Sequence, residues 1–344
     1  MPITVEEIAK LAGVSRATVS RVVNHHPNIR PEVRERVERI IAEYNYHPNR
    51  AAQSLATHRT NAIGLIVPNS FPLLFNDTFF PRLIQGIAEV CNANDYTVTV
   101  TLTTEPERQM VQFRHVLSSG AIDGVVVANA GIDDPLLPLL RDSGLPFVLV
   151  GRNPVQPDLC YVDVDNVSGA RVMTRYLIGL NHRAIGIVTG PLGRSAGRDR
   201  LEGYRLALEA AGIPFDDALV AEGDFTEQGG YQAARQLIAA QPTAIFACSD
   251  MMALGVLRAL AGEGLRVPDD VSVAGFDDFL AATAANPALT TIAQPVVELG
   301  AAAAALLVDL INAKGAPQTH DRTLPVQLVI RQSTRRLDGD AASR

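Results

Sequence analysis

Side chains suited to reading DNA are gathered in one short segment near the start of the chain. Two arginines, two hydroxyl residues and an alanine lie close together there, namely Arg16, Ala17, Thr18, Ser20 and Arg21. A forked guanidinium can donate two hydrogen bonds to guanine, a methyl group can contact thymine, and hydroxyl groups can hold phosphates. The same residues would also suit the solvated face of any small helix, so the surrounding elements must decide between the two interpretations.

Two short helices joined by a tight turn would position this segment. Thr4 and Glu7 have the spacing of a capping box and Gly13 provides a stop, which predicts a first helix of about two turns. Ser15 can cap a second helix that begins at Arg16. Two such helices with a glycine in the turn are the helix-turn-helix unit, in which the first residues of the second helix meet base edges in the major groove.

A third helix would complete a small all-α head over residues 1–46. Pro31 is favoured at the first position of a helix, and Val33, Val37 and Ile40 then recur at helical spacing. Charge supports a separate role for this part of the chain. Residues 1–60 contain nine Lys and Arg against six Asp and Glu, whereas the remaining 284 residues contain 21 against 31. A basic head on an acidic body confines affinity for phosphates to the head.

Residues 47–60 read as a connecting segment. Pro48 blocks an extension of the third helix, and the residues that follow include one large apolar side chain, Leu55. A segment this short and polar cannot hold a helix by itself. On its own residues it is a plain linker, or a helix that orders only with a partner.

From residue 61 onward, short apolar runs alternate with segments of helical periodicity. The predicted strands are 62–67, 97–101, 124–128, 147–150, 161–164, 184–188, 244–247 and 271–275. The predicted helices are 83–92, 107–118, 168–180, 200–211, 228–239 and 252–263. This alternation predicts an α/β body of parallel sheets. The pattern occurs twice, on either side of Asp163, which indicates two similar lobes.

The last helix and strand of the body, 296–312 and 325–330, would have to cross back between these lobes. We therefore expect lobe one at about 61–162 plus 294–322 and lobe two at about 163–293 plus 323–336. Ligands of such folds bind at the carboxyl ends of the strands, so the cleft between the lobes is the expected site.

The segments EEIAKLAGVSRATVSRVVN and YNYHPNRAAQSLA, with the alternating body behind them, resemble the LacI/GalR family of bacterial transcription regulators. The resemblance covers essentially the whole chain and implies a two-lobed, periplasmic-binding-protein-like (type I) effector domain. It also implies that residues 47–60 are a hinge helix, which pairs with a second copy in the minor groove and wedges Leu55 between base steps. The DNA contacts expected from the motif and the resemblance are Thr4, Ser15, Arg16, Ala17, Thr18, Ser20, Arg21, Asn24, Asn49, Ala52 and Leu55.

The resemblance places the family's effector-contacting arginine on Arg200 and its effector-binding aspartate on Asp277. A guanidinium and a carboxylate facing each other suit a polyol, whose hydroxyls accept from one and donate to the other. The alternative is a structural ion pair. Weaker candidates at cleft positions and strand ends are Phe79, Phe80, Asn129, Arg152, Phe225, Ser249 and Gln294, whereas Asp250 is expected to cap a helix beginning at Met251. The run 68–80 is longer than in most relatives and is a candidate lid.

We therefore expect a homodimeric regulator that binds near-palindromic double-stranded DNA and is controlled by a small-molecule effector. A repressor of carbohydrate uptake or catabolism genes is the favoured interpretation. A purine or nucleoside effector is the alternative within this class, and a solute-binding receptor is the alternative outside it.

Other features argue against further classes of function. The chain lacks the motifs of a catalytic nucleophile, a phosphate loop or a metal site, which argues against an enzyme or a cofactor. Cys91, Cys160 and Cys248 are too far apart for a metal knuckle and read as buried, reduced thiols. With no signal-like N-terminus and no apolar run long enough to cross a membrane, a cytoplasmic location is expected.

Overall fold

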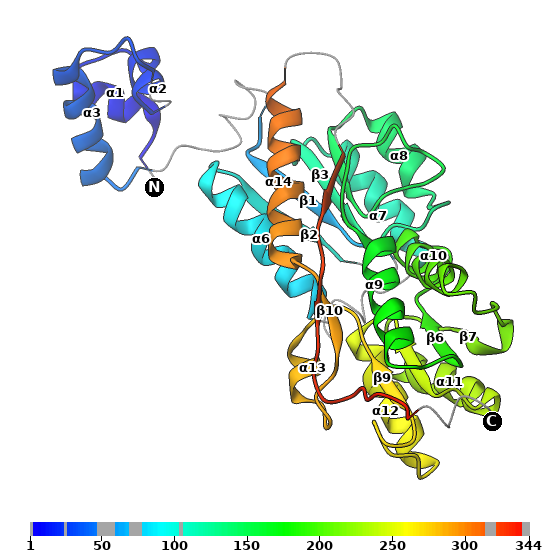
Figure 1. The fold of residues 1–344 in the computed structure, drawn as a ribbon. Coiled ribbons are helices and arrows are strands. Elements are labelled where there is room, and N and C mark those ends of the chain that lie inside the picture. The colour runs from blue at the N-terminus through cyan, green and yellow to red at the C-terminus, as the bar shows by residue number, and fades with distance from the viewer. Residues whose placement is uncertain are drawn as a thin grey trace. The chain divides into compact units, whose positions relative to one another are not determined.

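The computed structural model describes residues 3–23, 26–46, 59–68, 78–102, 106–313 and 321–338. Contacts divide the chain into residues 1–60, which contain the head, and residues 61–344, which form the body. Figure 1 shows the helices of the head and the layered body. The predicted linker 47–60 lies outside the described residues apart from Arg59 and Thr60.

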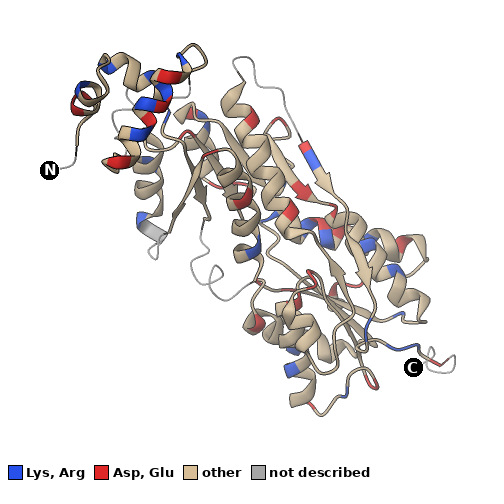
Figure 2. Cartoon of the chain, turned by 90° about the vertical axis from the view of Figure 1, so that its left-hand side faces the viewer, with Lys and Arg blue, Asp and Glu red and all other residues tan. Residues whose placement is uncertain are grey.

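The described part of the head contains the three predicted helices, α1 (Val5–Ala12), α2 (Arg16–Val23) and α3 (Pro31–Glu43). Gly13 adopts φ 61° at the end of α1, a backbone conformation in which glycine carries no steric cost. Ile8, Val19 and Val37 are fully buried and join the three helices in one small core. Figure 2 shows Lys and Arg on these helices next to Asp and Glu.

The first lobe of the body is built on a six-stranded parallel sheet in the order β11-β5-β4-β3-β1-β2. Its strands are β1 (Ala62–Ile66), β2 (Thr97–Thr101), β3 (Gly124–Ala128), β4 (Phe147–Val150), β5 (Tyr161–Val164) and β11 (Asp321–Leu324). Its helices are α6 (Phe79–Ala93), α7 (Pro106–Ser118), α8 (Leu136–Ser143) and α14 (Val296–Asn312). The apolar side chains of α6 and α14 pack in one core on the sheet, and those of α7 and α8 pack in another.

Helices α6 and α14 cross at two glycines. A Cβ atom on Gly86 would lie 1.9 Å from the carbonyl oxygen of Val297, and one on Gly300 would lie 2.2 Å from the carbonyl oxygen of Leu83. Only glycine allows this approach of two helix backbones. The long return helix is thereby fixed against the first lobe.

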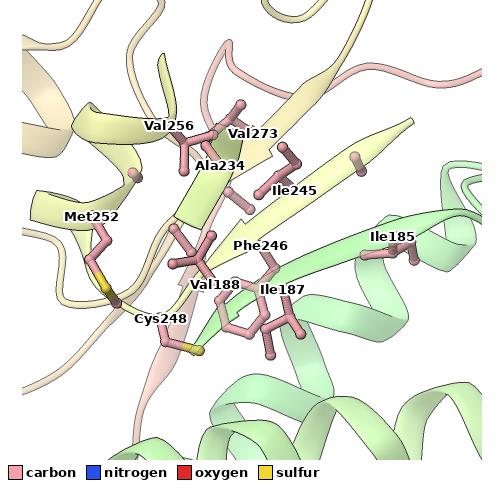
Figure 3. Close-up of a cluster of buried hydrophobic side chains, with 14 of the residues drawn as sticks. Ile185, Ile187, Val188, Ala234, Ile245, Phe246, Cys248, Met252, Val256 and Val273 are labelled. Atoms are coloured by element: carbon pink, nitrogen blue, oxygen red, sulfur yellow. The ribbon is translucent and has the colours of Figure 1, made fainter. Parts of the chain in front are cut away.

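The second lobe is built on a four-stranded parallel sheet in the order β7-β6-β8-β9. Its strands are β6 (Ile185–Thr189), β7 (Val220–Glu222), β8 (Ala244–Ala247) and β9 (Ser272–Ala274). Its helical elements are α9 (Asn166–Gly179), α10 (Ser195–Ala210), η1 (Asp217–Leu219), α11 (Glu227–Leu237), η2 (Ile238–Ala240), α12 (Asp250–Gly262) and α13 (Leu280–Ala284). Ile187, Ile245 and Phe246 are fully buried at the centre of the core that Figure 3 shows.

Within the described residues, the chain crosses between the lobes where β5 leads into α9, where β10 (Thr291–Ala293) leads into α14, and where β11 leads into β12 (Gln327–Val329). Strands β10 and β12 pair antiparallel. The expected lobe boundaries at 162/163 and 322/323 fall inside β5 and β11, so the sheet of the first lobe extends two residues further at each crossing. The backbone N–H of Asp165 donates to the carbonyl of Leu324, which holds two of the crossings side by side.

The structure also bears on two further predictions, the burial of the three cysteines and the absence of a membrane-spanning segment. Cys91 and Cys248 are buried as predicted, but Cys160, the residue before β5, is partly exposed. No helix among the described residues is long and apolar enough to cross a membrane.

Candidate DNA-binding face and ligand cleft

The second helix of the head exposes one polar face. Its start is capped as predicted, because the Oγ of Ser15 accepts from the backbone N–H of Thr18 at 3.1 Å and lies 2.9 Å from the Thr18 hydroxyl. Val19 and Val22 turn inward and are buried. Exposed residues of α2 are Arg16, Ala17, Ser20 and Arg21, whereas Thr18 is partly buried. Four of the predicted base-reading side chains therefore share one accessible surface.

Besides Ser15 and Thr18, the expected DNA contacts Thr4 and Arg16 also interact within the head. Thr4 and Glu7 form the predicted capping box, with the Thr4 backbone N–H 2.8 Å from the Glu7 carboxylate, and these hydrogen bonds lower the pKa of Glu7. Arg16 pairs with Glu6 at 3.1 Å, and both side chains are more than half exposed. An ion pair this exposed is weak and exchanges readily for a phosphate or a base edge. Asn24, Asn49, Ala52 and Leu55 lie outside the described residues.

The body has a cleft at the carboxyl ends of strands from both lobes. Of the nine predicted effector residues, eight line it, namely Phe79, Phe80, Asn129, Arg200, Phe225, Ser249, Asp277 and Gln294. The other lining residues are Ala130, Val150, Gly151, Asp163, Val164, Asn166, Arg194, Ser195, Ala196 and Leu299. Phe79 and Phe80 do not belong to a loop as expected, because they form the first turn of α6.

Arg200 is the central cation of the cleft and is 4% exposed. Its Nε donates to the Oδ1 of Asn166 at 2.9 Å, one Nη donates to the carbonyl of Cys248, and its guanidinium lies 3.6 Å from the centre of the Phe276 ring. The Oδ1 of Asp277 is 3.8 Å from the same Nη, so the two predicted residues do face each other. This separation is longer than a hydrogen bond and leaves both groups partly available to a ligand.

Asp277 is held on an unusual turn after β9. Its φ is 124° and that of Asp278 is 59°, conformations that cost a non-glycine residue free energy and occur where the surrounding structure enforces them. Gln294 donates to the Oδ1 of Asp277, and Arg331 forms an ion pair with Asp278. Asn129 and Phe225, both in the cleft lining, also have positive φ, at 67° and 68°. Three residues of the cleft lining thus have a backbone conformation that is uncommon for residues other than glycine.

The predicted capping role of Asp250 is wrong. Ser249 is the N-cap of α12 and accepts from the backbone N–H of Met252, while Asp250 is the first residue of the helix. The fully buried carboxylate of Asp250 instead accepts from the backbone N–H of Phe279 and from the hydroxyl of Thr291. Burial raises its pKa to about 7. Asp250 therefore ties the turn that carries Asp277, through Phe279, to β10, through Thr291.

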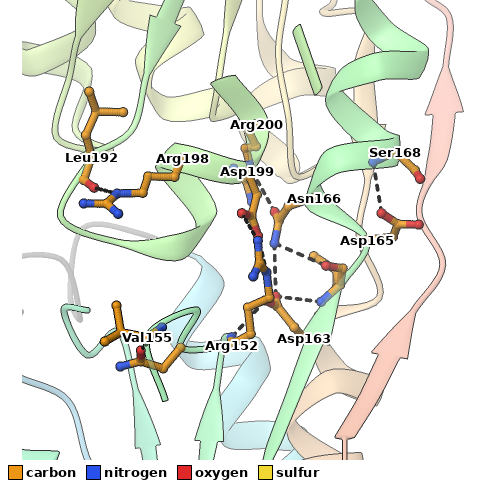
Figure 4. A network of polar contacts seen from close by, with 12 residues as sticks. Arg152, Val155, Asp163, Asp165, Asn166, Ser168, Leu192, Arg198, Asp199 and Arg200 are labelled. Atoms are coloured by element: carbon orange, nitrogen blue, oxygen red, sulfur yellow. Dashed lines mark hydrogen bonds and ion pairs between the residues drawn. The ribbon is translucent and has the colours of Figure 1, made fainter. Parts of the chain in front are cut away.

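The cleft contains polar residues that the sequence analysis did not identify. Asp163, Asn166 and Arg194 all line it. Burial lowers the pKa of Arg194, while Asp134 and Asp224 oppose this shift. Asp163 is 7% exposed, and its carboxylate accepts hydrogen bonds from neighbouring N–H groups, as Figure 4 shows. A carboxylate within an otherwise apolar strand was the signal for Asp163.

Arg152 is the predicted effector residue that does not line the cleft. It follows β4 in the first lobe and forms a bidentate ion pair with Asp199 on α10 of the second lobe. Beside it, the backbone N–H of Ile132 donates to the carbonyl of Gly193 at 2.9 Å, again from one lobe to the other. Arg152 therefore acts between the lobes, outside the lining of the cleft.

Comparisons with known proteins agree with this geometry. Residues 4–49 match the model of bacterial regulatory proteins of the lacI family, and residues 174–334 match a periplasmic binding protein-like domain. The HTH-type transcriptional regulator CelR of Thermobifida fusca is 40% identical over 331 residues, which cover 95% of each chain.

Two solved structures of full-length relatives are similar to the whole fold. A complex of the transcriptional regulator CelR with cellobiose has a TM-score of 0.77 and 36% identity, with 96% of this chain and 99% of that chain covered. The lac repressor dimer bound to operator and the anti-inducer ONPF has a TM-score of 0.83 and 29% identity, with 97% and 100% covered. With a helix-turn-helix head, a two-lobed body and this identity to a characterised regulator over nearly its full length, the chain belongs to the lacI family of bacterial transcriptional regulators.

Proposed function

We propose that this protein is a homodimeric repressor whose affinity for its operator is controlled by a neutral sugar bound in the cleft. The observation that carries the proposal is the convergence of Arg200, Asp277 and Gln294 with the Phe79 and Phe225 rings. Donors and acceptors that meet beside aromatic faces match the hydroxyls and the apolar face of a sugar ring.

The charges of the lining favour an uncharged effector. Asp163 and Asp277 contribute two acidic groups, and Arg194 and Arg200 contribute two basic ones. A phosphorylated or acidic sugar would add an unbalanced charge to a partly enclosed site, which is unfavourable.

Cellobiose is the first effector to test, because the CelR relative was solved as a cellobiose complex. The relative solved as a dimer on its operator supports the same assembly here. A two-fold dimer would present two copies of the face containing Arg16, Ala17, Ser20 and Arg21 to the half-sites of a near-palindromic operator.

The proposal is tested first by ligand-dependent thermal stability of the full chain. Cellobiose, other disaccharides, monosaccharides, sugar phosphates and nucleobases are compared, since a ligand of the native state raises the melting temperature by mass action. We expect a rise with a neutral sugar, and the same sugar should release an operator isolated by in vitro selection.

Variants then locate the site. Arg200→Ala and Asp277→Ala should each lose the sugar response while keeping operator affinity in its absence. Arg175→Ala, at an exposed position on α9, is the matched control and should respond like the wild type. A response to nucleobases alone, or a sugar response that survives both cleft variants, would contradict the proposal.

A further inference from the structure

Asp163 is a buried carboxylate without an ion-pair partner among the described residues. It lies near the end of β5, directly before the chain enters α9 and the second lobe. The guanidinium of Arg152, which follows β4, forms its ion pair with Asp199. A carboxylate in such a place is unfavourable for stability unless hydrogen bonds compensate, and buried titratable groups of this kind are frequent at functional sites.

Three N–H groups compensate the charge. The backbone N–H of Arg152 donates to Oδ2 of Asp163 at 3.0 Å, and that of Val164 donates to Oδ1 at 2.8 Å. The third donor is Nδ2 of Asn166, 3.0 Å from Oδ1. Figure 4 shows these groups converging on the carboxylate. Because all three are donors, the arrangement favours the ionised form of Asp163, in which both carboxylate oxygens act only as acceptors.

The bond to Asn166 fixes which way its amide points. Its Nδ2 donates to Asp163 and also lies 3.2 Å from the carbonyl of Val164, so the nitrogen end of the amide faces two acceptors. The oxygen end then faces Arg200, whose Nε donates to it at 2.9 Å. On its other edge the Arg200 guanidinium donates to the carbonyl of Cys248. The orientation of Arg200 therefore depends on Asn166, and that of Asn166 depends on Asp163.

We propose that Asp163 is a positioning residue for effector binding, whose ionised carboxylate orients Asn166 and through it holds Arg200 toward the cleft. Uptake of a proton by Asp163 then weakens the binding of the effector. The inference rests on the proposed role of Arg200 in the cleft. It makes the response to the effector sensitive to acid.

The groups around Asp163 bring its titration near neutrality. The pKa of Asp163 is raised to about 6, because the effect of burial is larger than the opposite effect of the hydrogen bonds from Arg152 and Val164. Asp199 on α10 raises the pKa further and Arg200 on the same helix lowers it. On β5, the side chain of Tyr161 also faces this charge. A protonated Asp163 gains a hydroxyl donor and loses an acceptor position, which weakens its hydrogen bond with the Asn166 amide and leaves the Val164 carbonyl as the remaining strong acceptor. The Asn166 oxygen is then held less firmly toward Arg200.

The first experiment needs no effector. In the free full-length dimer, the Nε–H resonance of Arg200, assigned by its loss in Arg200→Lys, is followed by NMR between about pH 5 and about pH 7.5. We expect it to titrate with a midpoint near 6, the pKa of Asp163. The titration should vanish in Asp163→Asn and in Asn166→Ala. It should persist in Asp142→Asn, which removes an exposed carboxylate from α8.

The second experiment measures cellobiose affinity by calorimetry. If only the ionised form of Asp163 is competent, wild-type affinity should fall about tenfold from about pH 7.5 to about pH 5. Asp163→Asn should bind weakly at both pH values and lose most of this pH dependence, and any part that remains would come from Asp250, whose pKa is about 7. An Arg200 resonance that does not titrate, or that still titrates in Asp163→Asn, overturns the inference. A wild type that binds no cellobiose at any pH counts against the proposed effector instead, and the NMR experiment still decides the role of Asp163.

Discussion

Arg152 and Asp199 join the two lobes of the body through two parallel hydrogen bonds, with Nε of Arg152 2.8 Å from Oδ2 of Asp199 and an Nη on Oδ1. The Asp199 side chain is 8% exposed and the Arg152 side chain 38%, so one end of the pair is buried. The hydrogen bonds to Asp199 raise the pKa of Arg152. This pair fixes the distance between the end of β4 and the start of α10, and with it the separation of the cleft walls.

Arg152→Met should lower the free energy of unfolding by about 1–3 kcal/mol, because it leaves the buried Asp199 carboxylate unpaired, while solvent at the Arg152 end limits the loss. Urea unfolding measures the effect. Arg141→Met is the control, since its pair with Asp158 is exposed at both ends and should change stability by less than about 1 kcal/mol. Equal stability of Arg152→Met and Arg141→Met would mean that the interlobe pair contributes nothing net.

Gly190 allows Phe225 to take its place in the cleft. A Cβ atom at Gly190 would lie 2.0 Å from Cζ of the Phe225 ring, so Gly190→Ala must displace the ring. We expect cellobiose affinity to fall by about tenfold or more, equivalent to about 1.4 kcal/mol, with operator affinity unchanged in the absence of sugar. Gly193→Ala, which meets nothing within 4 Å, is the matched control. If calorimetry gives the same cellobiose affinity for both variants, Phe225 does not contribute to sugar binding.

Asp163→Asn should stabilise the protein at neutral pH. The folded pKa of Asp163, about 6, lies above its ordinary value of 3.8, so folding favours the protonated form. Its contribution to stability is therefore present below the ordinary pKa and is lost as the pH rises through about 6. The neutral amide avoids this loss, and the variant should gain about 1–3 kcal/mol at about pH 7.5 and less at about pH 5.

Urea unfolding at the two pH values checks this prediction. The expected combination, greater stability with a weaker effector response, is the behaviour of a residue kept for function. Lower stability of Asp163→Asn at the higher pH would show that the hydrogen bonds to the ionised carboxylate outweigh the unfavourable effect of burying it.

Most strands of the body were predictable, because they form apolar runs or, in the edge strand β2, an alternating pattern of Thr and Val. Strands β2, β3, β4, β5 and β8 begin and end at the predicted residues. Strand β11 was not predicted, since it lies at the sheet edge with three of its four residues exposed and has no apolar pattern. Strands β7 and β10 were not predicted either, because each is three residues long and too short to show a pattern, whereas β9, of the same length, lies in the longer predicted run 271–275.

The cleft was predictable for Asn129, which directly follows β3, and for Arg200 and Asp277, which the family resemblance indicated. It was not predictable where tertiary contacts decide the role of a side chain. Arg152 also follows a strand, yet the position of Asp199 on another lobe directs its guanidinium away from the cleft lining. Asn166 entered the cleft because it opens α9 at a crossing between lobes, a position that depends on the packing of both.

Arg16 should read a base and not merely hold a phosphate, because it opens α2 on the exposed face and its partner in the free head, Glu6, is itself more than half exposed. Arg16→Ala should weaken binding to the selected operator by about 1–3 kcal/mol and relax the sequence preference at one base position in each half-site. Fluorescence anisotropy on the operator, on single-base variants and on random DNA separates the two roles. Arg36→Ala, an exposed position on α3, is the control and should bind all of these like the wild type. Equal losses for Arg16→Ala on operator and random DNA, with a salt dependence reduced by about one ion, would assign Arg16 to the phosphate backbone.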